Sequence, residues 1–234
     1  MTTYIVANWE SYATLKTAEQ WLVDFVHYYT PRPEVEVVVA PPFVFLHHLK
    51  NAIGRHKPDG LSLAAQDLSP FPFGDYTGAI AAEMVKGIAE FAILGHFSRR
   101  RYFHESHQEI ANKVSEAVAA EITPILCVDP SYARAQIAAL EELTLEHLIL
   151  AYDPYSAVGA PGAPTPRETA KAVAEIASLV PGRPILYGGP VRVDNARSYY
   201  DLDLVSGLLV GSASLDPLDF ANICLAAVKE EELA

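Results

Sequence analysis

One stretch of the chain reads Thr123-Pro124-Ile125-Leu126-Cys127-Val128, a nearly continuous apolar run. Runs of this kind recur along the sequence, and their starts lie 23 to 37 residues apart. The other seven are Tyr4–Ala7, Val35–Ala40, Leu61–Ala65, Phe91–Leu94, His147–Ala151, Pro184–Tyr187 and Gly207–Val210. A short run that is apolar throughout is typical of a strand buried on both faces of a parallel sheet. The sequence therefore predicts eight parallel strands.

The segments between these runs have the apolar spacing of helices. Between residues 17 and 29, apolar side chains gather at Trp21, Leu22, Phe25 and Val26, as on one face of a helix. Segments 106–120 and 165–179 have the same pattern, and the second opens with the capping-box signature of a helix start. Eight strands alternating with helices predict a single (β/α)8 TIM barrel over residues 1–234. A doubly wound open sheet is the alternative, but no Gly-x-Gly-x-x-Gly turn follows the first run.

The composition indicates a soluble acidic protein. The 234 residues include 17 Lys and Arg against 29 Asp and Glu, which gives a net charge of −12, and 50% of them are hydrophobic. This charge disfavours binding to nucleic acid, and no apolar stretch approaches the ~20 residues of a membrane helix. No secretory signal pattern opens the chain. Cys127 and Cys224 stand in apolar runs and are expected to be buried, reduced thiols, so we expect a cytoplasmic protein.

Polar residues and glycines follow the predicted strands, where a barrel of this type carries its chemistry. A histidine among carboxylates at this end can transfer protons. Glycines after the last two strands suit a phosphate, because their backbone N–H groups can approach its oxygens. Residues 155–164 are rich in small side chains and are predicted to form a lid. The candidate residues after the strands are Asn8, Glu10, Gln66, Asp67, His96, Asp129, Asp153, Gly188, Gly189, Gly211 and Ser212.

A metal site is an alternative interpretation of this end of the barrel. Its ligands would be the carboxylates of Glu10 and Asp153 and the imidazole of His96. The simpler interpretation is that Glu10 accepts a hydrogen bond from Ser98 or pairs with a neighbouring arginine. We therefore predict no metal ion at these three residues.

Nine segments spread along nearly the whole chain have a recognisable pattern in a fixed order. They are Asn8-Trp9, Ala64-Ala65-Gln66-Asp67, Gly74-Asp75-Tyr76-Thr77-Gly78, Ile93-Leu94-Gly95-His96, Arg99-Arg100-Arg101-Tyr102-Phe103, Thr123–Val128, Ala151-Tyr152-Asp153-Pro154, Leu186-Tyr187-Gly188-Gly189 and Leu209-Val210-Gly211. Through these segments the sequence resembles the triosephosphate isomerase family. The resemblance implies a homodimeric barrel that interconverts dihydroxyacetone phosphate and glyceraldehyde 3-phosphate, a step of glycolysis, without metal or cofactor.

The resemblance implies a catalytic role for five positions. His96 matches a histidine that acts in the family as a neutral electrophile. That enzyme is a standard example of a histidine whose pKa is lowered so that it stays neutral. Asn8 matches an asparagine two residues before the family's catalytic lysine, and that lysine is Glu10 here. The family's glutamate base is Asp153, and a second glutamate, which pairs with the lysine, is Ser98. Both members of that ion pair therefore differ together, and the local charge becomes one unit more negative.

The residues at the positions where the family binds phosphate also differ in this chain. The family has a serine after the Tyr-Gly-Gly segment, whereas this chain has Pro190, which has no N–H to donate. Gly211-Ser212 replaces a glycine pair, and Gly159 in the lid is kept. The loop that contains Tyr76 and Thr77 matches the one that completes a partner subunit's site, so a homodimer is expected.

Taken together, these substitutions predict a family barrel with impaired or repurposed aldose–ketose isomerase chemistry on a small phosphorylated or anionic ligand. Two alternatives stay open. One is a functional triosephosphate isomerase, and the other is a catalytically silent barrel used for binding or structure.

Overall fold

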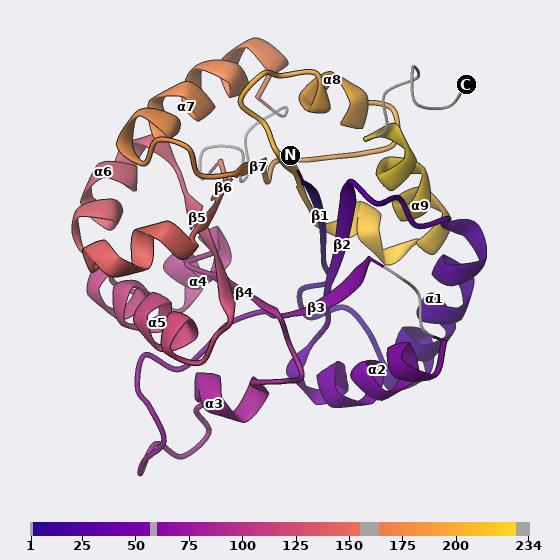
Figure 1. Ribbon diagram of the computed structural model, residues 1–234, viewed down its shortest axis with the longest axis horizontal. Helices are drawn as coiled ribbons and strands as arrows, with labels where there is room; N and C mark the ends of the chain where they lie inside the picture. Colours follow the sequence, from indigo (N-terminus) through magenta and orange to yellow (C-terminus); the bar gives the residue numbers. More distant parts are fainter. Residues whose placement is uncertain (1, 57–59, 155–163, 228–234) are drawn as a thin grey trace.

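The computed structural model describes residues 2–56, 60–154 and 164–227. Its eight strands form a closed parallel barrel in chain order, and β8 pairs back onto β1 (Figure 1). The prediction of a single (β/α)8 barrel is therefore confirmed. The strands are β1 (Thr3–Asn8), β2 (Val35–Ala40), β3 (Leu61–Ala65), β4 (Phe91–Leu94), β5 (Thr123–Val128), β6 (Ile149–Tyr152), β7 (Ile185–Tyr187) and β8 (Gly207–Val210).

Helices surround the barrel and connect successive strands (Figure 1). They are α1 (Leu15–Tyr28), α2 (Phe43–His56), α3 (Ala82–Val85), α4 (Phe97–Tyr102), α5 (His107–Ala119), α6 (Pro130–Ala138), α7 (Pro166–Leu179), α8 (Ala196–Tyr200) and α9 (Pro217–Ala226), with 3-10 helices η1 (Glu142–His147) and η3 (Ser212–Leu215). The capping box predicted before α7 is present, because the Thr165 hydroxyl accepts from the Glu168 N–H and the Glu168 carboxylate accepts in return from the Thr165 N–H.

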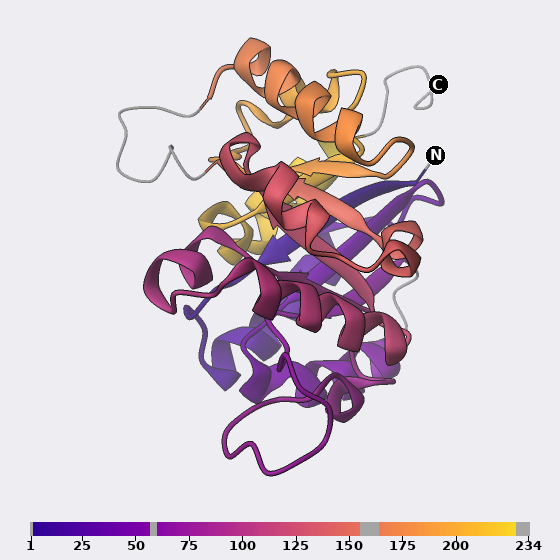
Figure 2. The same cartoon turned by 90° about the vertical axis from the view of Figure 1, so that its left-hand side faces the viewer.

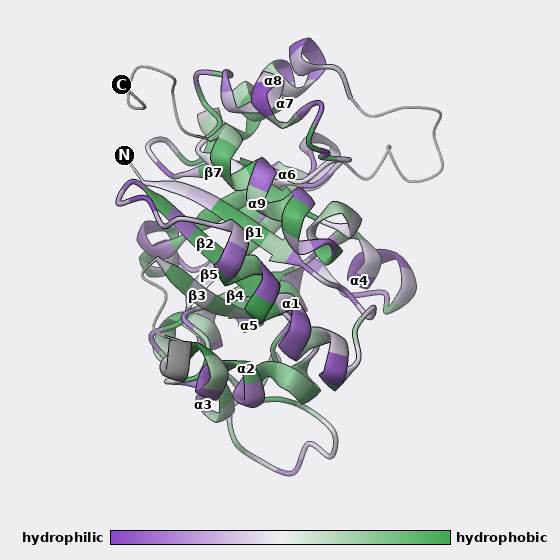
Figure 3. Cartoon of the chain, turned by 90° about the vertical axis from the view of Figure 1, so that its right-hand side faces the viewer, coloured by the Kyte–Doolittle hydropathy of each residue, from purple (hydrophilic) through white to green (hydrophobic). Residues whose placement is uncertain are grey.

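Two apolar layers hold the barrel together. One fills its interior and includes Val6, Val38, Ile125 and Leu209. The other lies between the strands and the helices, where Trp21 stacks on the neighbouring Phe25 ring. Figure 3 shows the resulting pattern, with hydrophobic strands inside and hydrophilic faces on the surrounding helices. Cys127 and Cys224 are buried and free, as expected from their apolar runs.

Barrel closure depends on a glycine. Gly207 begins β8 with φ of +152°, and a Cβ there would lie 1.9 Å from the carbonyl oxygen of Tyr4 on β1. Only glycine permits this approach of the two backbones.

Three strands differ in their boundaries from the sequence prediction. β1 (Thr3–Asn8) extends one residue beyond Tyr4–Ala7 at each end, and β6 ends at Tyr152 rather than Ala151. Residues 147 and 148 were expected in the sixth strand, but Glu142–His147 form a 3-10 helix and β6 begins at Ile149. The seventh strand begins at Ile185 rather than Pro184, whose carbonyl accepts from Leu150. The largest difference, two residues at the start of β6, arises at the N-terminal end of a strand, opposite the end where the site lies.

A long irregular segment, residues 66–81, connects β3 to α3 and projects away from the barrel (Figure 2). The Phe71 and Tyr76 rings stack within it, 4.5 Å apart. No helix in the described part of the chain is long and apolar enough to span a membrane.

Candidate active site

A cavity of about 300 Å³ lies where the strands end at their carboxyl sides. Parallel strands in a barrel deliver the residues that follow them to this one rim. The sequence-predicted residues that line the cavity are Asn8, Glu10, His96, Asp153, Gly188, Gly189, Pro190, Gly211 and Ser212. The structure therefore brings together residues from β1, β4, β6, β7 and β8.

His96 caps the helix that follows β4. Its Nδ1 atom accepts from the backbone N–H of Ser98, at 3.4 Å, and lies 2.8 Å from the Ser98 hydroxyl. An Nδ1 that accepts from a backbone N–H carries no proton of its own, so the ring proton sits on Nε2. Burial lowers the pKa of His96 to about 4. The side chain is thus a neutral imidazole whose Nε2–H is its donor.

Asp153 follows β6 and is almost completely buried. One carboxylate oxygen accepts from the N–H of Phe97 at 2.7 Å and lies 3.9 Å from His96 Nε2. Burial raises the pKa of Asp153 to about 7. Because His96 is neutral, the two groups do not form an ion pair. They are a weak acid and a hydrogen-bond donor that face the same small space.

Glu10 does not bond with Ser98, contrary to the expectation from sequence. The Ser98 hydroxyl instead lies on His96, because it occupies the first turn of α4 directly above that ring. Glu10 has a positive φ of 49°, its N–H donates to Asn8 Oδ1, and its carbonyl accepts from Gln66. These backbone contacts hold the residue in a conformation uncommon for a side chain with a Cβ.

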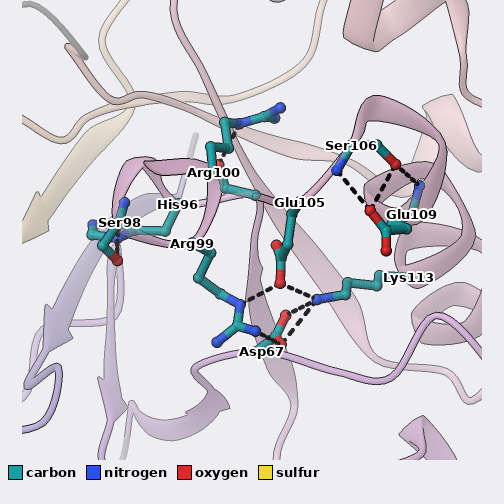
Figure 4. A network of polar contacts seen from close by, with 10 residues as sticks. Asp67, His96, Ser98, Arg99, Arg100, Glu105, Ser106, Glu109 and Lys113 are labelled. Carbon is teal, nitrogen blue, oxygen red and sulfur yellow. Dashed lines mark hydrogen bonds and ion pairs between the residues drawn. The ribbon is translucent and has the colours of Figure 1, made fainter. Parts of the chain in front are cut away.

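The neighbouring arginine does not pair with Glu10 either. Arg99 contacts Asp67 at 2.9 Å and Glu105 at 2.5 Å, and Lys113 contacts the same two carboxylates. Figure 4 shows this closed network, in which Arg99 extends away from His96 and Ser98. The expected role of Asp67 in the site is therefore an indirect one, because its carboxylate binds two cations outside the cavity.

The remaining predicted residues divide into four groups. Ser98 and Gln66 line a neighbouring cavity of about 540 Å³, which shares Glu10 and His96 with the first. Asp129 caps α6 through the Ser131 N–H, which is a structural role. Tyr76 and Thr77 lie exposed in the projecting segment. Gly159 and most of the predicted lid lie outside the described residues.

Four residues of the cavity were missed by the sequence analysis: Phe97, Pro154, Val191 and Leu209. Phe97 is the most informative, because its backbone N–H holds the Asp153 carboxylate. The signal was available, since the residue after His96 begins a helix and its N–H has no partner inside that helix.

A family model described as triosephosphate isomerase matches residues 3–227. A relative named triosephosphate isomerase from Symbiobacterium thermophilum is 33% identical, over 97% of this chain and 98% of its own length. Relatives of the same name from Xanthomonas euvesicatoria and Coxiella burnetii are 34% and 30% identical, over 95% and 94% of this chain. The closed barrel and these sequence matches agree, and the chain belongs to the triosephosphate isomerase family.

Proposed function

We propose that the protein transfers a proton between adjacent carbons of a small hydroxy-carbonyl ligand, by aldose–ketose isomerase chemistry that is impaired or repurposed relative to its relatives. The observation that carries this proposal is the short distance, 3.9 Å, between His96 Nε2 and a carboxylate oxygen of Asp153. A base with a pKa near the operating pH and a neutral donor are what such a transfer needs.

In the proposed reaction, the Asp153 carboxylate removes a proton from the carbon beside the carbonyl. The electron pair of that C–H bond moves to the carbonyl oxygen and leaves an enediolate. The Nε2–H of His96 donates to the developing oxyanion, and Asn8 lines the same cavity. Asp153 then returns the proton to the neighbouring carbon, while His96 Nε2 gives its proton to the oxyanion and takes the proton of the adjacent hydroxyl. The proton on carbon and the proton on oxygen are thus both relocated, and no proton or electron is gained or lost overall.

Three substitutions support impairment. Glu10 places a negative charge where the resemblance implies a lysine, and two unit charges 4 Å apart interact by about 4 kcal/mol near a protein surface. Asp153 is one methylene shorter than the family's glutamate, and a displacement of about 1 Å can slow a reaction ~100-fold. Pro190 lines the cavity without an N–H to give.

Ligand binding is assigned to the β7 and β8 side of the cavity. Gly188, Gly189, Gly211 and Ser212 present backbone there, and Gly159 is assigned by resemblance alone. The names of the relatives favour a phosphorylated or anionic ligand, whereas the charge of the cavity favours an uncharged one.

A homodimer in the cytoplasm completes the proposal. The projecting segment exposes Phe71, Phe73 and Tyr76, and exposed aromatic side chains of this kind are enriched at interfaces. Sedimentation velocity at micromolar concentration should show a dimer, and a monomer alone would contradict this part.

A functional triosephosphate isomerase is the second candidate. It is favoured by the names of the relatives and by the neutral state of His96, which the resemblance implies for that enzyme.

The test is solvent-deuterium incorporation, followed by NMR, into dihydroxyacetone and its phosphate. We expect slow incorporation by the parent protein that is lost in Asp153→Asn. The matched control is Asp194→Asn, at an exposed carboxylate that pairs with Arg192 outside the cavity. Absence of incorporation in the parent would instead indicate a catalytically silent barrel, and fast isomerisation of the phosphate would indicate the second candidate.

A further inference from the structure

The cavity carries negative charge without a positive partner. Among its described lining residues are two carboxylates, Glu10 and Asp153, and neither lysine nor arginine. A small site of this composition disfavours a dianionic ligand, because unit charges of one sign repel strongly where water is scarce.

The nearest cations are already bound elsewhere. The Arg99 guanidinium binds Asp67 through Nη2 and Glu105 through Nε. Arg100 donates to the carbonyls of Gly95 and Cys127 and to the side chain of Gln136. Neither arginine lines the cavity, and breaking these contacts would leave partly buried carboxylates or carbonyls without a partner.

The Glu10 carboxylate, in contrast, is available. Within the described ranges, the hydrogen bonds of Glu10 come from its backbone, to Asn8 and from Gln66, and its side chain forms no ion pair. A carboxylate has two acceptor oxygens that suit vicinal hydroxyl groups. Phe97, Val191 and Leu209 add apolar surface against which a carbon chain can pack.

We propose that the ligand of this site is an uncharged short-chain hydroxy-carbonyl compound without a phosphate ester, held through its hydroxyl groups by Glu10. The inference rests on the proton transfer proposed above and narrows its substrate class. Cavity volume agrees with it, because about 300 Å³ accommodates a small sugar. Pro190 agrees as well, because this position offers a ligand no backbone donor.

The experiment compares binding of dihydroxyacetone and dihydroxyacetone phosphate at millimolar concentrations by ligand-observed NMR titration. The parent should bind dihydroxyacetone at least about tenfold more tightly than its phosphate. Glu10→Gln should lower this ratio by about tenfold, because it removes the charge that repels phosphate and one acceptor for hydroxyls. Glu175→Gln, which removes one exposed charge on α7, should leave the ratio unchanged.

Tighter binding of the phosphate by the parent, an unchanged ratio in Glu10→Gln, or binding of neither compound would overturn the inference. Its failure is distinguishable from failure of the proposed function, which is measured by deuterium incorporation. Preferential binding of dihydroxyacetone without incorporation would support the ligand class and contradict the proton transfer.

Discussion

The two walls of the cavity differ in which part of the chain determines their chemistry, the backbone or individual side chains. On the wall from β4 to β6, backbone groups at the start of α4 hold both His96 and Asp153. On the wall from β7 through β8 to β1, the chemistry depends on single side chains, Glu10 and Pro190. A geometry set by helix backbone does not depend on the identity of the side chain at Ser98, because the N–H groups that hold His96 and Asp153 belong to the main chain. A charge set by one side chain is reversed by one substitution.

The largest expected effect separates the walls directly. His96→Ala should slow deuterium incorporation at least about 100-fold, because it removes the donor to the oxyanion. Pro190→Ala, on the other wall, should change the rate by no more than about threefold, because the substitution adds an N–H to a ligand-binding surface and touches no proton. An equal loss of deuterium-incorporation rate in the two variants would show that proton transfer does not depend mainly on the β4–β6 wall.

The second effect is the pH dependence of the reaction rate, which Asp153 on the β4–β6 wall should set. Asp153 must be ionised to act as a base, and burial raises its pKa to about 7. The rate at limiting ligand concentration should therefore fall about tenfold per pH unit below this value and level off above it. A profile measured from pH 5 to pH 9 that stays flat below pH 7 would contradict the assignment of Asp153 as the base.

A third and smaller effect tests how Ser98 positions the histidine. Ser98→Ala removes the hydroxyl from His96 Nδ1 and keeps the backbone N–H, so we expect a loss of about three- to tenfold. Ser98→Thr should restore the rate. The ¹⁵N shifts of His96 should move toward a mixture of tautomers in Ser98→Ala, and unchanged shifts would argue that the backbone alone fixes the ring.

The smallest effect is on stability. The pKa of Asp153 is raised on folding from 3.8 to about 7, so the folded state favours the protonated acid and loses stability as pH rises through this interval. Asp153→Asn should therefore raise the melting temperature at pH 8 by several degrees and leave it nearly unchanged at pH 4. A lower melting temperature of the variant at pH 8 would contradict the burial argument.

His96 acts on stability in the opposite direction. Its pKa is lowered on folding from 6.5 to about 4, so the unfolded chain takes up a proton first as pH falls through this interval. Stability that depends on His96 is thus lost below about pH 6.5.

The sequence predicts most of the barrel because its strands are short and apolar throughout. Val35–Ala40 and Thr123–Val128 match β2 and β5 at both ends. The sixth strand was misplaced because the apolar pattern at His147 and Leu148 does not distinguish a strand from the end of a 3-10 helix.

The candidate site was predictable to the extent that its residues directly follow strands. Asn8, His96 and Asp153 meet in the cavity for this reason. The partner of Ser98 was not predictable, because the choice between Glu10 and His96 depends on the positive φ of Glu10 and the first turn of α4. Phe97 was missed because its contribution comes from its backbone N–H, which only a predicted helix start at this residue would have revealed.

The central claim is that the scaffold is intact and that a few side chains set its chemistry. The measurement is kcat/KM for glyceraldehyde 3-phosphate in the parent and in the quadruple variant Glu10→Lys, Ser98→Glu, Asp153→Glu and Pro190→Ser. We predict a parent value far below the diffusion limit of about 10⁸ M⁻¹s⁻¹ and a gain of at least about 100-fold in the variant. A parent that already approaches this limit, or a folded variant that gains nothing, would contradict the claim.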